Sequence, residues 1–313
     1  MRSQDIKFVK NFENHVKQTI HKYKLLTKKD KVLVACSGGK DSTIVLYILN
    51  KFGYKPEALI IDLEIGKWSD ENLENLKYNI MTRNGVFGNL QGKDIPLHVI
   101  SPREIFGTSV CYLKSLAKEN AGITSCMICG VMKKWLLNKK ARELNATKIA
   151  TGHNMDDEAQ NLILNMLKGN PEMCANLGPM TGKIKDKLFV DRIKPLYFTP
   201  EADIRRYSEL MGFKIQYDRC PCSVDGYRKE IRAMLNELEK KHPGIKENLV
   251  KNLAAVKKVR TPMRYKKLIG NGTRKSGNES ILYCESCGEP ARNRTCRLCQ
   301  ILACIKGDSQ NKL

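Results

Sequence analysis

The chain lacks any hydrophobic run long enough to cross a membrane, because none of its apolar stretches reaches 18 residues. Residues 1–7 also lack the apolar core of a secretory signal peptide. We therefore expect a cytoplasmic protein without a membrane partner. Thiols stay reduced in that compartment, so the twelve cysteines are expected to be metal ligands or reactive thiols rather than disulfides.

Acidic residues are scarce relative to basic ones: 33 Asp and Glu stand against 55 Lys and Arg, which gives a net charge of +22. Positive charges in such excess repel one another unless a polyanion binds, so nucleic acid is the expected partner. Many basic residues come in pairs on expected helices, such as Lys133-Lys134 and Arg205-Arg206. Each pair alone is typical of a solvated helix face, and only their sum indicates RNA or DNA binding.

Strand-like and helix-like patterns alternate through the first half of the chain. Apolar runs rich in Val, Ile and Leu predict strands at 31–36, 57–63, 95–100 and 147–151. Helical periodicity predicts helices near 42–53, 69–83, 126–145 and 154–168. This alternation predicts an α/β fold with a doubly wound parallel sheet, on which ligands lie beyond the carboxyl ends of the strands.

Composition divides the chain into four expected parts. Residues 1–28 contain an amphipathic helix, and 29–215 form the α/β catalytic domain. Lysine-rich helical patterns, interrupted at His242-Pro243-Gly244, predict a basic helical extension over 216–270. A linker rich in Gly, Asn, Ser and Lys then leads to a small cysteine module at 281–304.

A glycine turn follows the first expected strand, within Ser37-Gly38-Gly39-Lys40-Asp41-Ser42. Glycines let a backbone approach an anion closely, and the free N–H groups of a helix start attract negative charge. The serine hydroxyls and Lys40 add donors, and Asp41 is a candidate Mg²⁺ ligand. A bare Gly-Gly turn would only connect strand and helix, but this set of side chains favours binding of a phosphate group. The spacing differs from that of the Walker-type loop.

Three consecutive acids, Asp156-Asp157-Glu158, follow Gly152-His153 at the end of another expected strand. Small residues there leave room for a nucleotide base, and the acids are candidates for magnesium ligands or for a general acid and base. The alternative is that they only stabilise a helix start through its dipole. Their place at the same sheet edge as the glycine turn favours the functional interpretation.

Four cysteines near the end of the sequence form two Cys-x-x-Cys pairs: Cys284, Cys287, Cys296 and Cys299. Four thiolates without an open position are typical of structural zinc, and so short a segment has little core of its own. The sequence therefore predicts a closed Zn²⁺ site. Cys304 has no pair in this module and is expected to be buried.

A second group of cysteines is dispersed. Cys126 and Cys129 lie at the start of an expected helix, where the helix dipole favours thiolates, and Cys220-Pro221-Cys222 follows much later. Cys126, Cys129 and one distant cysteine give three thiolates, which are one short of structural zinc but suit an iron–sulfur cluster with one open iron. The alternatives are a buried apolar pair, a redox disulfide, or a second zinc site with Cys222 as fourth ligand.

The glycine turn resembles the pyrophosphate (PP) loop of the N-type ATP pyrophosphatases. The chain as a whole resembles the TtcA/TtuA family of tRNA 2-thiouridine synthetases, above all the TtuA branch. The residues that carry this resemblance are the glycine turn, the dispersed cysteines, the Gly152–Glu158 segment, Ile193–Leu196 and the terminal cysteine pairs. The resemblance covers about residues 8–300 and implies a PP-loop, adenine nucleotide alpha hydrolase-like fold. Lysidine synthetase is the nearest rival, since it shares the loop and the Gly-His motif but lacks both sets of cysteines.

The resemblance implies an ATP-dependent sulfur transfer to tRNA, in which a uridine C2 oxygen is adenylated and then replaced by sulfur. The implied [4Fe-4S] ligands are Cys126, Cys129 and Cys220. The expected catalytic residues are Lys133, Asp157 and Cys129. The expected nucleotide-binding residues are Ser37, Gly38, Gly39, Lys40, Asp41, Ser42, Asp62, Gly152 and His153.

Two departures from the family pattern affect these expectations. No cysteine precedes Cys36, although TtuA-type proteins commonly begin with another zinc knuckle, and Cys222 stands where the family usually has Tyr. The first departure favours wobble uridine 34 as the target, with T-loop uridine 54 as the alternative. The sulfur donor is either sulfide or a ubiquitin-like thiocarboxylate protein, and a homodimer is a further expectation. The competing classes are an ATP-dependent ligase or amidotransferase with two structural zinc sites, and a non-catalytic RNA-binding scaffold.

Overall fold

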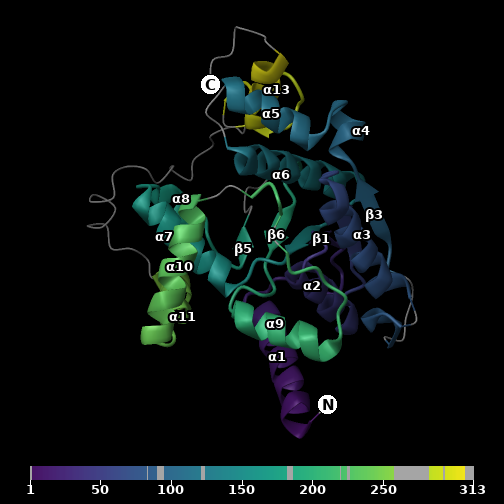
Figure 1. Ribbon diagram of the computed structural model, residues 1–313, viewed down its shortest axis with the longest axis vertical. Coiled ribbons are helices and arrows are strands. Elements are labelled where there is room, and N and C mark those ends of the chain that lie inside the picture. Colours follow the sequence, from purple (N-terminus) through teal and green to yellow (C-terminus); the bar gives the residue numbers. More distant parts are fainter. Residues whose placement is uncertain are drawn as a thin grey trace.

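A six-stranded sheet forms the centre of the computed structural model, which describes residues 2–82, 84–89, 95–120, 124–181, 186–218, 220–223, 226–256, 282–291 and 293–306 (Figure 1). Its strand order is β3-β2-β1-β4-β6-β5. Neighbouring strands run parallel except for the short β5, which pairs antiparallel with β6. The strands are β1 (Val32–Cys36), β2 (Glu57–Ile61), β3 (Leu97–Ile100), β4 (Lys148–Thr151), β5 (Met180–Thr181) and β6 (Asp191–Ile193).

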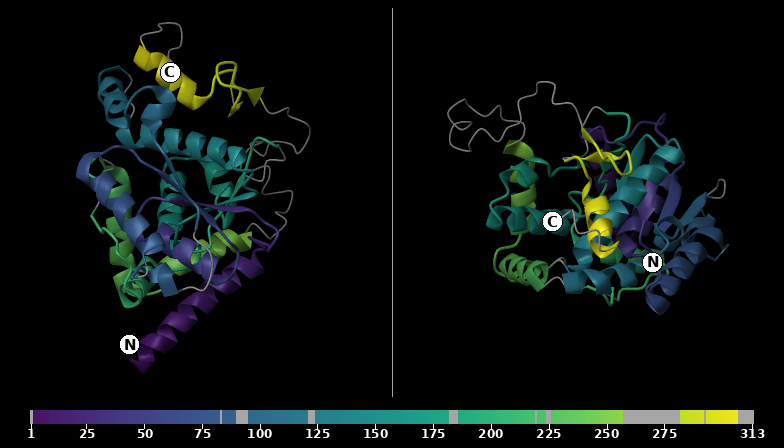
Figure 2. Two further views of the ribbon diagram at one scale, coloured as in Figure 1. Left: turned by 90° about the vertical axis from the view of Figure 1, so that its right-hand side faces the viewer. Right: turned by 90° about the horizontal axis from the view of Figure 1, so that it is seen from above.

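Alternate residues of the central strands enter two hydrophobic layers. Val34 and Ala58 belong to the layer that α1 (Ser3–Lys22), α2 (Lys40–Lys51) and α9 (Glu201–Met211) cover. Leu33 and Leu59 belong to the other layer, with Leu136 of α6 (Ser125–Glu143). Helices thus lie on both faces of the sheet (Figure 2), which is why the strands are continuous apolar runs. The doubly wound α/β fold predicted from the sequence is confirmed.

Helices connect the strands in the expected alternation. α3 (Gly66–Met81) follows β2, α6 precedes β4, and α7 (Met155–Leu167) follows β4. Several elements lie outside the predicted ones. Three of them contain only four or five residues, too few for a periodic pattern, and the fourth is an 11-residue helix that the sequence analysis did not predict. They are the 3-10 helix η1 (Val86–Asn89), α4 (Pro102–Phe106), α5 (Val110–Asn120) and α8 (Pro171–Ala175).

Two basic helices, α10 (Gly226–Lys241) and α11 (Ile245–Val256), fall in the interval of the expected extension. They pack on α7 in one hydrophobic cluster, in which Ile231, Leu235 and Val250 join Met155 and Ala159. Since α7 begins at the carboxyl end of β4, this packing brings the basic helices beside the edge of the sheet where ligands are expected.

The C-terminal cysteine module consists of β7 (Leu282–Tyr283), β8 (Pro290–Ala291) and α13 (Arg297–Lys306). Leu298 and Ile301 share a hydrophobic cluster with Leu113 of α5 and Ile128 of α6, and Figure 1 shows α13 against α5. The module is therefore built onto these helices. The expected linker 270–280 and the side chain of Cys304 lie outside the described residues. None of the described helices is long and apolar enough to span a membrane.

Candidate active site and metal centres

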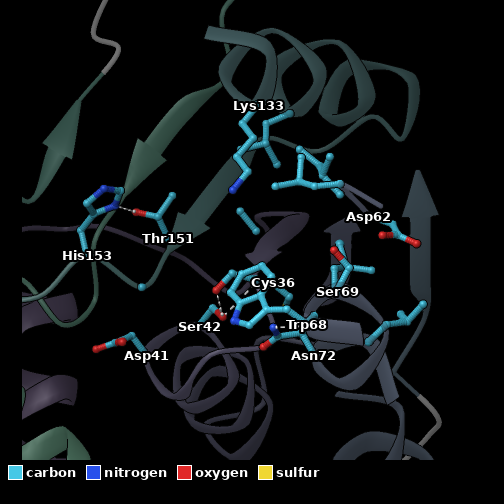
Figure 3. A pocket seen from close by; sticks show the side chains of 18 of the residues that line it. Cys36, Asp41, Ser42, Asp62, Trp68, Ser69, Asn72, Lys133, Thr151 and His153 are labelled. Atoms are coloured by element: carbon cyan, nitrogen blue, oxygen red, sulfur yellow. Dashed lines mark hydrogen bonds between the residues drawn. The ribbon is translucent and has the colours of Figure 1, made fainter. Parts of the chain in front are cut away.

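A cavity of about 290 Å³ lies at the carboxyl ends of β1, β2 and β4 (Figure 3). Eight of the residues expected from the sequence line it. They come from the turn after β1, the end of β2, α6, and the connection between β4 and α7. These residues are Ser37, Asp41, Ser42, Asp62, Lys133, Gly152, His153 and Asp157. Folding therefore gathers widely separated segments around one space.

The turn after β1 depends on its glycines. Gly38 has a φ of +80°, and a Cβ atom there would lie 2.5 Å from the Cβ of Asn72. A Cβ at Gly152 would lie 2.7 Å from the backbone nitrogen of Ser42. Gly39 is the N-cap residue of α2, and no side chain caps that helix start. The first N–H groups of α2 are therefore available as donors to a phosphate.

Ser42 and Lys40 hold the turn in shape. The Ser42 hydroxyl accepts a hydrogen bond from the Ser37 N–H at 3.1 Å. Lys40 pairs with Asp41 at 3.1 Å and with Glu201 of α9 at 3.0 Å, and it is not among the residues that line the cavity. The structure thus places the Lys40 ammonium between two carboxylates, and its expected role in nucleotide binding stays a prediction.

The three acids at the start of α7 have different surroundings. Asp156 pairs with Lys246 of α11 at 2.5 Å, and Glu158, which is fully buried, pairs with Lys194 at 2.6 Å. Of the three, only Asp157 lines the cavity. Two of the acids are therefore structural, and one is available for chemistry.

Asp157 is fixed by its own helix and by α10. Its Oδ2 accepts from the Asn154 N–H at 3.3 Å and its N–H donates to Asn154 Oδ1 at 3.1 Å, which is a capping box. Arg228 donates to its Oδ1 at 3.0 Å. Burial raises the pKa of Asp157, and the Arg228 guanidinium acts in the opposite direction. Sequence analysis missed Arg228, because it resembles the other basic residues of the extension.

Lys133 and Asp62 line other sides of the cavity. The Lys133 side chain points into it from α6, across from α2 (Figure 3), and it forms no ion pair with any residue that the structure describes. Asp62 follows β2 and accepts from the Glu64 N–H at 2.9 Å. Trp68 and Asn72 of α3 also line the cavity. They carry no motif in the sequence and were not expected.

His153 lies at the cavity in a cationic environment. Its Nδ1 is 3.1 Å from Thr151 Oγ1. Burial, together with the charges of Lys194, Arg228 and Lys134, lowers its pKa to about 4. The imidazole is therefore neutral near pH 7, and it cannot supply the positive charge that a phosphate would need.

The four C-terminal cysteines form a compact site. Their sulfur atoms all lie within 4.8 Å of one another. The Cys296 N–H donates to Cys284 Sγ at 3.2 Å, and the Cys299 N–H donates to Cys296 Sγ at 3.4 Å. Burial raises the pKa of Cys284, but hydrogen bonds from backbone N–H groups outweigh it and lower that pKa to about 6. This donor set fits a tetrahedral Zn²⁺.

Five other cysteines gather where α5, α6 and residues 220–223 meet. We call them the thiol cluster: Cys111, Cys126, Cys129, Cys220 and Cys222. The Cys126 sulfur lies 3.9 Å from the Cys222 carbonyl oxygen, and the Cys222 thiol is near enough to raise the pKa of Cys111. Cys129, Cys220 and Cys222 pack against one hydrophobic cluster. The cysteines that the sequence analysis grouped are thus neighbours, and Cys111 is an addition to them.

Helix α6 joins the thiol cluster to the cavity. Cys129 and Lys133 are four residues apart, so they share a helix face and are separated by about 6 Å along its axis. Leu63 lines the cavity and also belongs to the hydrophobic cluster on which Cys129 and Cys220 pack. The thiols and the cavity are therefore adjacent.

Comparison with known proteins identifies this arrangement. Residues 30–187 match the family model of the tRNA methyl transferase HUP domain. A tRNA-5-methyluridine(54) 2-sulfurtransferase of Pyrococcus horikoshii is 34% identical over 94% of this chain and 85% of its own length. The tRNA 2-thiolation protein NcsA of Haloferax volcanii is 29% identical over 88% of this chain and 82% of its own length. The solved U34-tRNA thiolase NcsA from Methanococcus maripaludis, with its [4Fe-4S] cluster, is 27% identical at a TM-score of 0.66, covering 80% of this chain and 79% of that chain.

The chain belongs to the TtuA-like family of tRNA sulfurtransferases. In this TtuA-like chain the thiol cluster fits a polynuclear centre better than a single ion. A tetrahedral Zn²⁺ with bonds of about 2.3 Å holds its sulfurs about 4 Å apart. Among the described residues, no three thiol-cluster sulfurs lie within 4.8 Å of one another. In an iron–sulfur cluster each thiolate binds a different iron, so the cysteine sulfurs can lie farther apart than around a single ion.

Cys111 is the thiol that the sequence gave no reason to expect in the TtuA-like site. It lies in α5, which no periodic pattern predicted, and it has no cysteine near it along the chain. Burial raises the pKa of the Cys111 and Cys220 thiols and is the largest cause of the shift, while the charge of Lys114 lowers both pKa values. A spatial signal, the shared hydrophobic cluster of α5 and α6, identifies this residue where sequence spacing does not.

Proposed function

We propose that this protein is an ATP-dependent tRNA 2-sulfurtransferase that adenylates the C2 oxygen of a uridine and replaces it with sulfur. The observation that carries the proposal is the place of Cys129 and Lys133 on one face of α6, because it puts thiols next to the phosphate-loop cavity. A ligase or amidotransferase needs no thiols there. A non-catalytic scaffold needs neither the thiols nor the cavity.

The proposed ATP site uses the turn after β1. The first N–H groups of α2 and the hydroxyls of Ser37 and Ser42 would hold the phosphates, with Mg²⁺ on Asp41 and the adenosine toward Asp62. The uridine C2 oxygen attacks the α-phosphorus, a C2–O–P bond forms, and pyrophosphate leaves. A further feature supports this site: Gly152 lets β4 approach the start of α2.

Lys133 and Asp157 are the proposed catalytic side chains. The Lys133 ammonium, which has no carboxylate partner among the described residues, is suited to neutralise charge that develops on the α-phosphate and the oxyanion at C2. Burial makes the Asp157 carboxylate a better base than an exposed one, so it can orient the uracil and accept the proton of the sulfur nucleophile. Sulfur attacks C2, the C–O bond breaks, and AMP leaves.

The proposed metal centres have separate tasks. Cys126, Cys129 and Cys220 would hold a [4Fe-4S] cluster. When bound, this cluster supplies an iron with an open position at which sulfur can bind. The chain itself keeps the Cys129 thiolate one helical turn from Lys133. The four C-terminal cysteines would hold Zn²⁺, which closes a module packed on α5 and α6.

The proposed tRNA path runs beside β6 and α10. Burial lowers the pKa of Lys134, and the nearby charge of Arg192 lowers it further. Cations crowded in this way gain stability when phosphates approach them. Their position around His153 would bring the RNA backbone to the mouth of the cavity, which supports tRNA as the polyanion implied by the basic composition.

We propose the wobble uridine 34 as the target, because the solved relative that aligns over 80% of this chain is a U34-tRNA thiolase. Uridine 54 is the alternative, since the Pyrococcus horikoshii relative at 34% identity is named for that position. The donor, either sulfide or a ubiquitin-like thiocarboxylate protein, and the homodimer stay predictions.

The experiment that tests this function uses anaerobically reconstituted protein, ATP, sulfide and tRNA that lacks 2-thiouridine. Mass spectrometry of nucleosides should detect 2-thiouridine, and mapping of nuclease fragments should assign its position. Asp157→Asn should lower the rate by about 100-fold or more, while Glu172→Gln, at an exposed acid of α8, should not change it. Consumption of ATP without any thiolated nucleoside, or equal rates for wild type and Asp157→Asn, would contradict the proposal.

A further inference from the structure

Helix α3 holds the segment of chain that leads to Cys220. Trp68 Nε1 donates a hydrogen bond to the Asp218 carbonyl oxygen at 3.1 Å, and the Asn72 side chain donates to Gln216 Oε1 at 3.0 Å. Trp68 and Asn72 are four residues apart and so share one face of α3. This helix face therefore fastens the chain two and four residues before a member of the thiol cluster.

The same face of α3 also meets the nucleotide cavity. Trp68 and Asn72 both line that cavity (Figure 3). Asn72 is 4% exposed, and it packs directly on the phosphate turn, since a Cβ at Gly38 would lie 2.5 Å from the Asn72 Cβ. Two side chains of one helix thus touch both the space for a nucleotide and the chain before Cys220.

Asn79 of α3 fixes the start of this segment in a different way. Its side chain donates to the Lys214 carbonyl oxygen at 2.7 Å and accepts from the Lys214 N–H at 3.0 Å. Asn79 is not among the residues that line the cavity, so it holds Lys214 whatever fills that space. Asp218, nearer to the thiol cluster, is held by a side chain that does line it. A ligand in the cavity therefore acts on the end of the segment next to Cys220.

We propose that Trp68 and Asn72 are positioning residues that couple occupation of the cavity to the placement of Cys220. A nucleotide that contacts the indole favours the ring orientation in which Nε1 reaches Asp218. The inference rests on the proposed function, because that function puts ATP in the cavity and Cys220 on an iron–sulfur cluster. Such coupling is reciprocal, so the nucleotide should help to retain the cluster, and the cluster should tighten nucleotide binding by the same factor.

The first test measures iron loss from the full-length reconstituted protein. A chelator is added with and without Mg²⁺ and an ATP analogue that has a methylene group between the α and β phosphorus atoms and cannot release pyrophosphate. The analogue should slow iron loss from wild type by about fivefold or more. Trp68→Phe keeps a ring in the cavity but lacks the donor, so the analogue should bind, as calorimetry can show, and slow iron loss little. Equal slowing in both proteins, or none in wild type, would overturn the proposal.

Two further variants separate coupling from general stability. Gln216→Met removes the hydrogen bond to Asn72 from outside the cavity, so it should weaken the effect of the analogue without changing its affinity. Thr82→Val removes a bond of the same helix, to the Tyr78 carbonyl at 2.8 Å, and should behave as wild type. Full protection in Gln216→Met would overturn the proposal. So would iron loss from Trp68→Phe that is faster by the same factor with and without the analogue, since that marks a merely structural role.

A last readout needs no iron and separates the inference from the proposed function. In the full-length protein without iron, the analogue should slow alkylation of Cys220 by iodoacetamide several-fold in wild type but not in Trp68→Phe. Mass spectrometry of peptides measures this, with Cys174 of α8 as internal reference. A wild type that shows this protection but takes up no cluster would refute the iron–sulfur chemistry and leave the coupling. A wild type that thiolates tRNA without any protection would refute the coupling alone.

Discussion

The two cysteine centres of this protein are built in opposite ways. The C-terminal set comes from one short segment, its sulfurs lie within 4.8 Å of one another, and backbone N–H groups donate directly to Cys284 and Cys296. The thiol cluster is assembled from α5, α6 and residues 220–223, and its sulfurs are more widely spaced. A local, compact set is suited to close around one ion and stabilise a fold. A dispersed set depends on the whole domain and can stand next to a substrate cavity.

The two centres nevertheless share support. Leu298 and Ile301 of the C-terminal module are in one hydrophobic cluster with Leu113 of α5 and Ile128 of α6, the helices that carry the thiol cluster. Arg142 of α6 also pairs with Glu289 of the module. The compact centre therefore supports the helices that carry the dispersed one. Loss of the compact centre should affect the thiol cluster, whereas loss of a thiol-cluster ligand should leave the C-terminal site intact.

Removal of a thiol-cluster ligand should have the largest effect. Cys129→Ser should lose bound iron and reduce thiolation by roughly 100-fold or more, because Cys129 is the thiol one helical turn from Lys133. Zinc content should not change, since the C-terminal site shares no ligand with it. Metal analysis and 2-thiouridine quantification check this, with Cys174→Ser on α8 as the matched control. A Cys129→Ser protein that keeps its iron would contradict the assignment.

Removal of a C-terminal ligand should have a smaller effect on activity. Cys287→Ser should lose zinc and lower the thermal midpoint, because the module can no longer close. Activity should fall by about tenfold, as for a supporting group of a metal site, with part of the iron retained. The control is Ser286→Ala at the exposed neighbouring position. Complete loss of both metals in Cys287→Ser would show that the two centres form one unit, and it would contradict their separate roles.

Much of this architecture could be predicted from the sequence, because it depends on local patterns. The strand before Ser37, the glycine turn and the C-terminal cysteine pairs each follow from neighbouring residues, and the sheet follows from the alternation of apolar runs. The cavity was predictable as well, since the carboxyl ends of parallel strands meet at one edge. These features require no knowledge of which helices pack together.

What the sequence did not reveal depends on tertiary contacts. Cys111 lies in α5, a helix that the sequence analysis did not predict, and it joins the thiol cluster only because α5 packs near α6. The ion pair of Lys40 with Glu201 could not be predicted, because Glu201 is far away in sequence. Arg228 reaches Asp157 only because α10 packs on α7. In each case the role of the side chain is set by a partner from another element.

The smallest expected effect concerns Cys222. It tests whether the thiol cluster keeps an open position, unlike the closed C-terminal site. The contact of Cys222 with Cys126 is made by its carbonyl oxygen at 3.9 Å, whereas its thiol acts on the pKa of Cys111. The Cys222 sulfur is therefore not needed as a ligand in a three-thiolate site. Cys222→Ser should keep its iron and change activity by no more than about two- to threefold, which corresponds to about 0.5 kcal/mol. Cys220→Ser, two residues away, should lose iron. If iron were lost in Cys222→Ser and kept in Cys220→Ser, Cys222 would replace Cys220 as the third ligand. If iron were lost in both variants, the cluster would have four thiolate ligands and no free position for sulfur.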